Sequence, residues 1–128
     1  MAERRIQAPP LNPESEPFYK AAAEGRFMIR RCTACGKAHW YPRAICPFCW
    51  GETAWEQASG QGTVYSYSVM RRTDPPFSIA YVTLAEGPTM MTSLVDCDFD
   101  ALTIGMAVQL VWHPTEGGPP VPCFKPAG

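Results

Sequence analysis

The chain has 128 residues, a formal net charge of −1 and 46% hydrophobic residues, with 15 Phe, Trp and Tyr side chains among them. This is enough apolar material for a packed core, so the composition excludes a chain that is disordered over most of its length. No apolar run approaches the ~18 residues that a membrane-spanning helix needs. Residues 1–10 are polar and then proline-rich, unlike a signal peptide. We therefore expect a cytoplasmic protein with no membrane contact.

Charge is divided unevenly along the chain. Residues 1–50 hold eight Lys or Arg against four Glu, whereas residues 51–128 hold three Lys or Arg against eight acidic residues. This asymmetry predicts two regions with different roles.

The N-terminal region predicts an extended arm followed by one short helix. Residues 1–13 are rich in proline and polar groups, and the next segment, 15–24, contains three consecutive alanines. Ser15 is a suitable N-cap and Gly25 a suitable C-terminal stop. Phe18 is expected to dock the helix on the rest of the protein.

The remainder of the chain predicts a mainly β fold. A short strand over 26–31 leads into two cysteine pairs, and alternating apolar and polar residues after Gly60 predict five further strands, at 63–70, 77–84, 89–95, 107–113 and 121–125. Prolines in the last segment favour an edge strand. Five short strands without crossover helices fit an antiparallel OB-type barrel. The expected units are an N-terminal arm and helix (1–26), a zinc ribbon (27–58) and an OB-fold domain (59–128).

Four of the six cysteines form two C-x-x-C pairs that are separated by ten residues. Such tight pairs are typical of metal knuckles rather than of a disulfide framework. Four thiolates without an open coordination position suit a structural Zn²⁺ ion. Iron in a rubredoxin-like site is the main alternative, but the sequence has no other redox motif and predicts no redox cofactor. The predicted metal ligands are Cys32, Cys35, Cys46 and Cys49.

The sequence lacks the patterns that mark catalytic sites, including nucleophile elbows, phosphate-binding loops and H-E-x-x-H. We expect His39 to pack in a loop under the ribbon and His113 to be solvated at a strand end. Cys97 and Cys123 have no evident histidine partner. The acidic segment 96–100 lacks the glycine and the distal glutamate of a calcium loop, which favours a solvated turn. No catalytic residue is predicted.

Taken together, the motifs resemble those of one family. They are a capped helix with Phe18, the two cysteine pairs with Gly36 and Trp55, and then the segments SGQGTVYS (59–66), YVTLAEG (81–87), LVD (94–96), IGM (104–106) and CFKP (123–126). This succession, which covers roughly residues 15–126, resembles the DUF35 family of acyl-CoA-associated proteins, which combine a rubredoxin-like zinc ribbon with an OB-fold.

The resemblance implies a small non-catalytic subunit that an acyl-CoA-processing enzyme requires. Such proteins accompany thiolase-fold enzymes, namely thiolases and retro-aldolases, or MaoC-like enoyl-CoA hydratases, and they stabilise the partner and help to shape its acyl-CoA site. On this basis Arg71 and Arg72, at a strand end, are candidates to contact CoA phosphates, with a solvated strand end as the alternative. Aromatic residues near the knuckles are candidates for the partner interface or for the ribbon's own core: Trp40, Tyr41, Phe48 and Trp50.

Two other functions remain open at this point. A zinc ribbon joined to an OB-fold also occurs in nucleic-acid-binding proteins, but the barrel half holds only Arg71, Arg72 and Lys125 as cations, too few to neutralise phosphates along a strand. The other alternative is an enzyme that acts alone on acyl thioesters through Cys97 or Cys123.

Overall fold

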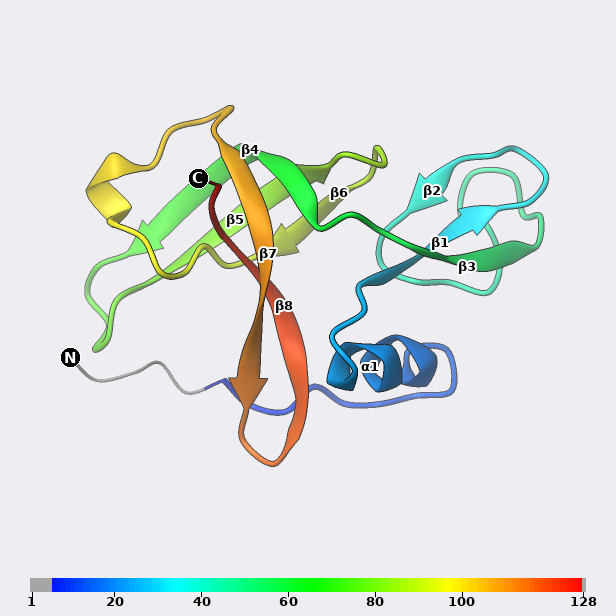
Figure 1. The fold of residues 1–128 in the computed structure, drawn as a ribbon, viewed down its shortest axis with the longest axis horizontal. Helices are drawn as coiled ribbons and strands as arrows, with labels where there is room; N and C mark the ends of the chain where they lie inside the picture. The colour runs from blue at the N-terminus through cyan, green and yellow to red at the C-terminus, as the bar shows by residue number, and fades with distance from the viewer. Residues whose placement is uncertain (1–5, 128) are drawn as a thin grey trace.

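The computed structural model describes residues 6–127. Figure 1 shows a curled β-sheet, a smaller ribbon of strands beside it, and one helix below both. In chain order the elements are α1 (Glu16–Ala23), β1 (Met28–Cys32), β2 (Ala38–His39), β3 (Thr53–Gln57), β4 (Gln61–Met70), β5 (Phe77–Leu84), β6 (Thr89–Thr92), η1 (Phe99–Ala101, a 3-10 helix), β7 (Ala107–Thr115) and β8 (Gly118–Pro126). Residues 1–5 of the predicted arm lie outside the described residues.

Helix α1 has the predicted extent, but its first turn is closed differently. Ser15 occupies the N-cap position without a side-chain cap bond, and its hydroxyl accepts the backbone N–H of Asn12 instead (3.2 Å). Asn12 Oδ1 accepts the N–H groups of Glu14 (3.0 Å) and Ser15 (2.9 Å). The capping role predicted for Ser15 is therefore wrong, because its hydroxyl is used one turn earlier. Gly25 ends the helix at φ +79°, as predicted.

The ribbon is a three-stranded antiparallel sheet in the order β2-β1-β3. Strand β1 begins two residues later than predicted, and β3 was not predicted. Arg30 of β1 lies opposite Trp55 of β3, and its guanidinium carbon sits 4.4 Å from the centre of the Trp55 ring. Next to this pair Arg31 binds Glu56 across the strands at 3.0 Å. These side-chain contacts favour the observed register between β1 and β3.

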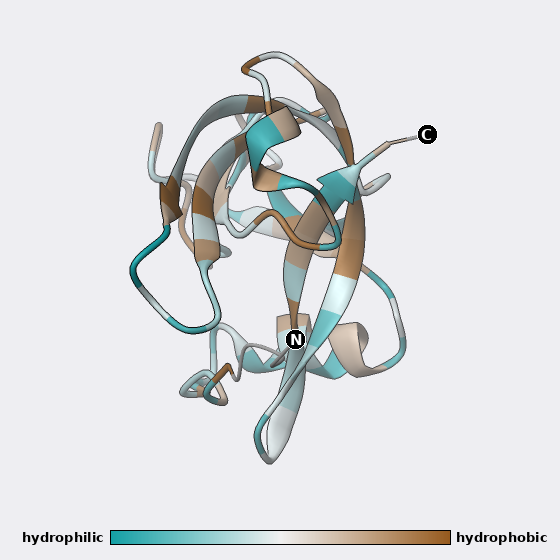
Figure 2. Ribbon diagram, turned by 90° about the vertical axis from the view of Figure 1, so that its left-hand side faces the viewer, coloured by the Kyte–Doolittle hydropathy of each residue, from teal (hydrophilic) through white to brown (hydrophobic). Residues whose placement is uncertain are grey.

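The second sheet is the predicted five-stranded antiparallel sheet, in the order β6-β5-β4-β7-β8. Its residues alternate between the core and the outside, seen as brown bands along the strands in Figure 2; in β5, for example, Ser78, Ala80, Val82 and Leu84 are buried. The sheet curls until Leu94 bridges Phe124 of β8, which gives the OB-type half-barrel. Strand β8 is longer than predicted because its prolines lie on an edge strand, where a missing N–H costs little.

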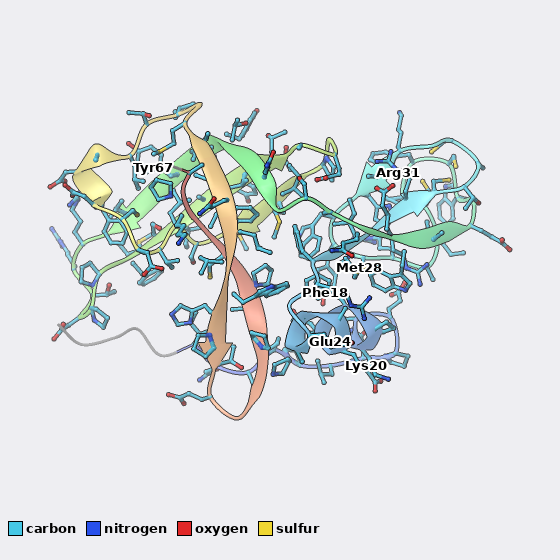
Figure 3. All side chains as sticks on the ribbon, in the orientation of Figure 1. Phe18, Lys20, Glu24, Met28, Arg31 and Tyr67 are labelled. Atoms are coloured by element: carbon cyan, nitrogen blue, oxygen red, sulfur yellow. The ribbon has the colours of Figure 1, made fainter. Side chains whose placement is uncertain are left out.

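An aromatic cluster joins helix, ribbon and barrel. Phe18 of α1 is fully buried, and its ring centre lies 5.1 Å from that of Trp40, 6.2 Å from that of Phe27 and 6.2 Å from that of Trp112. Figure 3 shows Phe18 at the junction between the helix and the strands. The helix therefore docks through Phe18, as predicted, and the contact fixes the ribbon against the barrel.

Candidate metal centre

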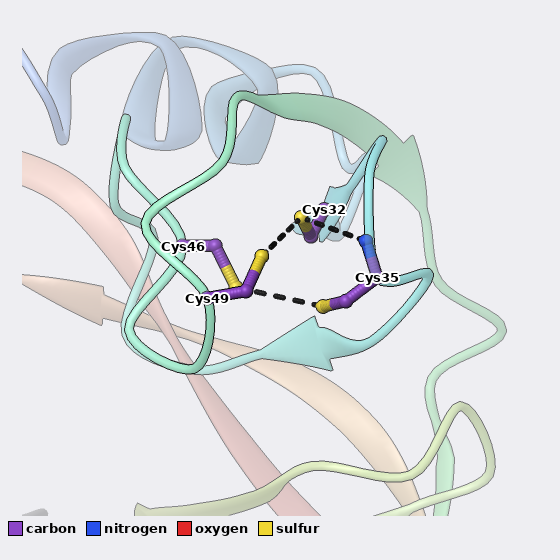
Figure 4. A group of neighbouring side chains, drawn as sticks. All are labelled: Cys32, Cys35, Cys46 and Cys49. Carbon is purple, nitrogen blue, oxygen red and sulfur yellow. Dashed lines mark hydrogen bonds between the residues drawn. The ribbon is translucent and has the colours of Figure 1, made fainter.

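The four predicted ligands come together in one cluster. Their sulfur atoms all lie within 4.8 Å of one another, and Figure 4 shows the two pairs facing each other across a common centre. The Sγ atoms of Cys32 and Cys49 are 3.4 Å apart, and those of Cys35 and Cys46 are 3.7 Å apart. A tetrahedron of sulfurs about 2.3 Å from a zinc ion has edges of about 3.8 Å. The donor set therefore fits a closed, four-coordinate zinc site.

Both cysteine pairs have the same backbone geometry. In each pair the N–H of the residue after the second cysteine donates to the carbonyl of the first: Gly36 to Cys32 (3.1 Å) and Trp50 to Cys46 (2.9 Å). This turn requires positive φ, which is 76° at Gly36 and 68° at Trp50. Glycine adopts this conformation freely, whereas a tryptophan is strained in it. The equal spacing of C-x-x-C-G and C-x-x-C-W was the sequence signal for this strained residue, and our sequence analysis missed it.

Backbone donors prepare one sulfur for metal binding. The N–H groups of Cys35 and Ala34 both point at Cys32 Sγ, each at 3.3 Å. The bond from Cys35 is the main reason why the pKa of Cys32 falls to about 6, so this sulfur favours the thiolate form. The pKa of Cys49 is about 11: the Gly51 N–H lowers it, but the neighbouring Cys32 and burial raise it. A divalent cation would supply the positive charge that lets all four sulfurs ionise together.

Gly51 leaves room for the sulfurs. A Cβ atom at this position would lie 3.2 Å from Cys32 Sγ and 3.3 Å from Cys49 Sγ, tighter than ordinary van der Waals contact. The N–H of Cys46 also donates to the Gly51 carbonyl at 2.9 Å. Gly51 is thus a second residue of the site that sequence analysis did not identify.

His39 is not part of the cluster. It is 3% exposed, and its Nε2 atom accepts the backbone N–H of Arg43 at 3.2 Å. The predicted packing is confirmed, but the predicted loop is wrong, because His39 lies in strand β2 and pairs with Arg30 of β1. Burial lowers the pKa of His39, so the neutral ring is favoured. Cys97 and Cys123 also lie outside the cluster, and burial raises the pKa of the Cys97 thiol, which disfavours a nucleophilic role.

The predicted interface aromatics differ in exposure. Trp50 is 84% exposed and Phe48 58% exposed, although Lys37 Nζ sits 5.2 Å from the centre of the Phe48 ring. Tyr41 is 38% exposed. Trp40 is half-buried in the aromatic cluster, where it contacts Phe18. Phe48 and Trp50 are thus the most exposed of the four and Tyr41 is exposed to a lesser degree, whereas Trp40 serves the protein's own packing.

The arginines predicted to contact CoA lie at the end of β4. Arg71 forms an ion pair with Asp100 at 2.8 Å, and both side chains are exposed. They border a cavity at the mouth of the barrel whose lining also includes Asp96, Asp98 and Phe99. Arg72 is exposed too. Among residues 6–127 no helix is long and apolar enough to cross a membrane.

Comparison with known proteins identifies both halves of the fold. Residues 20–56 match the family model described as the ChsH2 rubredoxin-like zinc ribbon domain, and residues 55–113 match that of the ChsH2 C-terminal OB-fold domain. A solved structure described as "Ltp2-ChsH2(DUF35) aldolase" contains a chain that is 33% identical, with a TM-score of 0.82; the match covers 94% of this chain and 99% of that one. A DUF35-family structure from Sulfolobus solfataricus is 15% identical with a TM-score of 0.68 over 91% of this chain and 87% of that one, which is a likeness of fold.

Curated relatives agree with this assignment. A "Probable enoyl-CoA hydratase alpha subunit" of Thermomonospora curvata is 35% identical over 126 residues, which are 93% of this chain but 39% of the relative. A "DUF35 domain-containing scaffold protein" of Methanothermobacter thermautotrophicus is 37% identical over 91 residues, which are 65% of this chain and 68% of the relative. The chain thus spans well under half of the hydratase relative. With its zinc ribbon, its OB-type barrel and these matches over nearly its whole length, the chain belongs to the DUF35 family.

Proposed function

We propose that this chain is a non-catalytic, zinc-binding accessory subunit of a thiolase-family enzyme, a thiolase or a retro-aldolase, that acts on acyl-CoA thioesters. The observation that carries the proposal is the match to a chain in the structure described as "Ltp2-ChsH2(DUF35) aldolase", which extends over 99% of that chain. The matched residues, which are 94% of this chain, thus correspond to nearly the full length of one chain in a structure described as an aldolase.

The chemistry of the metal centre supports an accessory role. Four cysteines satisfy a zinc ion completely, so no coordination position remains for water or substrate. Binding energy at such a site stabilises the fold instead, because a ribbon of this size has little core of its own. In the proposed complex the ion keeps the exposed rings of Phe48 and Trp50 in a fixed position for the enzyme subunit.

A hydratase partner is the second candidate, and one observation favours it. The hydratase relative is aligned over 93% of this chain, yet the aligned residues are 39% of its own length. In that relative a module of this kind is joined to a much longer chain. This is the arrangement expected if such modules work beside the catalytic part of a CoA-processing enzyme.

Nucleic-acid binding is less well supported, because two adjacent arginines of the ribbon are engaged within the protein. Arg30 stacks on Trp55 and donates to the Thr53 carbonyl at 2.9 Å. Arg31 pairs with Glu56. A basic groove with free cations is what a single strand requires, and these arginines do not provide one.

The proposed contact with CoA remains a prediction, and single mutations can separate the contributions of Arg71 and Arg72. A phosphate would have to compete with Asp100 for Arg71, whereas the side chain of Arg72 has no ion pair among the described residues. Arg72→Ala is therefore expected to weaken the affinity of the complex for a CoA thioester more than Arg71→Ala. Equal affinities for both variants and the wild type would remove these residues from the CoA site.

Reconstitution tests the accessory role. The enzyme subunit that copurifies with this chain is assayed on acyl-CoA substrates alone, with the wild-type chain, and with the chain by itself. We expect turnover by the pair, little by the enzyme subunit alone and none by this chain alone. Turnover by this chain alone would instead make it an enzyme.

A further inference from the structure

Strands β4, β5 and β6 contain no charged residue. Their 22 residues would hold about four if they matched the 18% charged fraction of the whole chain. The outer face of an antiparallel sheet that meets water normally carries charged side chains, and so do edge strands, which they protect from unwanted pairing. The absence of charge here is therefore a property that solubility alone does not explain.

The outer face of these strands instead presents large apolar and aromatic side chains. Tyr65 is 66% exposed, Tyr81 46% and Met91 61%. Tyr81 pairs directly with Met91 on one side and with Ser66 on the other. The ladder shifts between Val64 and Ser66, so the bulge places Tyr65 beside this row. Three large side chains thus form one patch across three strands.

This patch continues toward the zinc ribbon. Thr83 and Thr89 extend the outer face, and their hydroxyl oxygens are 2.9 Å apart. Thr89 also lines a cleft whose other wall is formed by Lys37 and Phe48 of the ribbon. The turn between β5 and β6 points toward the ribbon in Figure 1. The surface therefore runs from Tyr65 across β6 to Phe48, two residues from Trp50.

The electrostatics of the surface select the kind of partner. Nucleic acid and the phosphates of CoA need Lys or Arg side chains, and the three strands have none. Protein interfaces, in contrast, have cores that are depleted in charge and enriched in Tyr, Trp, Phe and Met. The strand part of the surface has this composition, and charged side chains enter only at its ribbon end, where Lys37 lies over the Phe48 ring.

We propose that the outer face of β4–β6, continued by Phe48 across the cleft, is a single docking surface for a largely uncharged face of the enzyme subunit. This inference rests on the proposed function, because it assigns the place where the partner binds. It also explains why the aromatics of the knuckle and of the barrel are exposed on connected parts of the molecule.

Insertion of one positive charge tests the surface. Met91→Lys, on the edge strand β6, and Tyr65→Lys, at the bulge of β4, each place an ammonium group in the patch at an exposed position. Leu11→Lys is the matched control, since Leu11 is 53% exposed and lies beside α1 near Glu16 and Lys20. Zinc content and thermal unfolding confirm that each variant is folded. Affinity for the copurifying enzyme subunit is then measured with purified components.

We expect the two patch variants to bind the enzyme subunit at least tenfold more weakly than the wild type, and Leu11→Lys to bind within twofold of it. Wild-type affinity in both patch variants would refute the docking surface and leave the accessory function standing. No binding by the wild type would refute both. If the isolated wild-type chain is a dimer that Met91→Lys separates, the surface joins two copies of this chain and the proposal is overturned.

Discussion

Replacing Trp50 by glycine is expected to separate the role of this residue in the fold from its role in binding. Trp50 has φ 68°, a conformation that costs a residue with a Cβ atom about 1–2 kcal/mol and glycine almost nothing. Glycine adds a cost of about 0.5–1 kcal/mol because its unfolded chain is more flexible. Trp50→Gly therefore relieves about 0.5–1 kcal/mol more strain than the entropy that it adds.

The side chain itself contributes little to the fold. With 84% of its surface exposed, about 16% of a ~250 Å² side chain is buried, and ~40 Å² at about 25 cal/mol per Å² gives about 1 kcal/mol. The sum of the three terms is close to zero. The free energy of unfolding of Trp50→Gly should therefore stay within about 1 kcal/mol of wild type, a shift of roughly 4 °C or less in Tm.

Binding should respond differently. If Trp50 inserts into the enzyme subunit, loss of its ring should cost about 2 kcal/mol or more, which is roughly a thirtyfold increase in Kd. Thermal unfolding and calorimetric binding are measured on the same preparation. Trp50→Ala is the control: it also lacks the ring but retains the backbone strain, so it should be less stable than Trp50→Gly by about 1 kcal/mol.

Two results would refute this reasoning. Unfolding or zinc loss in Trp50→Gly would mean that the ring supports the ribbon. Wild-type affinity in a well-folded Trp50→Gly protein would mean that Trp50 lies outside the interface.

Three further predictions concern the metal centre, the aromatic cluster and pH. Purified protein should be colourless with one zinc per chain, Cys46→Ser should lose the ion and Cys97→Ser should retain it; a visible thiolate-to-iron absorption band would contradict the zinc assignment. Phe18→Ala should lower the free energy of unfolding by about 3–5 kcal/mol, whereas Leu11→Ala, at an exposed position, should lower it by less than about 1 kcal/mol. Equal losses for the two variants in urea denaturation would show that Phe18 is not central to the packing. Because burial lowers the folded-state pKa of His39, the unfolded chain binds more protons, so this contribution to stability is complete above pH ~6.5 and is lost as pH falls below it. The urea midpoint of unfolding should therefore change less between pH 7.5 and pH 5.5 in His39→Gln than in the wild type. If the change is the same in both proteins, the loss of stability at low pH comes from the thiolates and not from His39.

The sequence was most informative where the constraint is local. The two C-x-x-C pairs predicted the sulfur cluster because each spacing closes its own turn, and period-two alternation predicted β4 and β5 closely because each strand buries one face. Strand β3 was missed because its place depends on pairing with β1, more than 20 residues earlier. The packing of Arg30 on the Trp55 ring depends on the same pairing, and no local pattern indicated it.

Long-range packing also explains what the sequence left undecided about the aromatics. Trp40 and Trp50 are both tryptophans near a cysteine knuckle, yet Trp40 is half-buried against Phe18 and Trp50 is almost fully exposed. Their difference arises when α1 docks on the ribbon, and no local pattern encodes that event. In the same way, the ion pair of Arg71 depends on Asp100, 29 residues later.

The most direct test of the accessory role is affinity purification of the tagged chain from its native host, with the bound chains identified by mass spectrometry. The proposed function predicts stoichiometric recovery of a thiolase-fold subunit, with a MaoC-like hydratase subunit as the second candidate. Recovery of nucleic acid, of ribosomal proteins, or of no partner would contradict it.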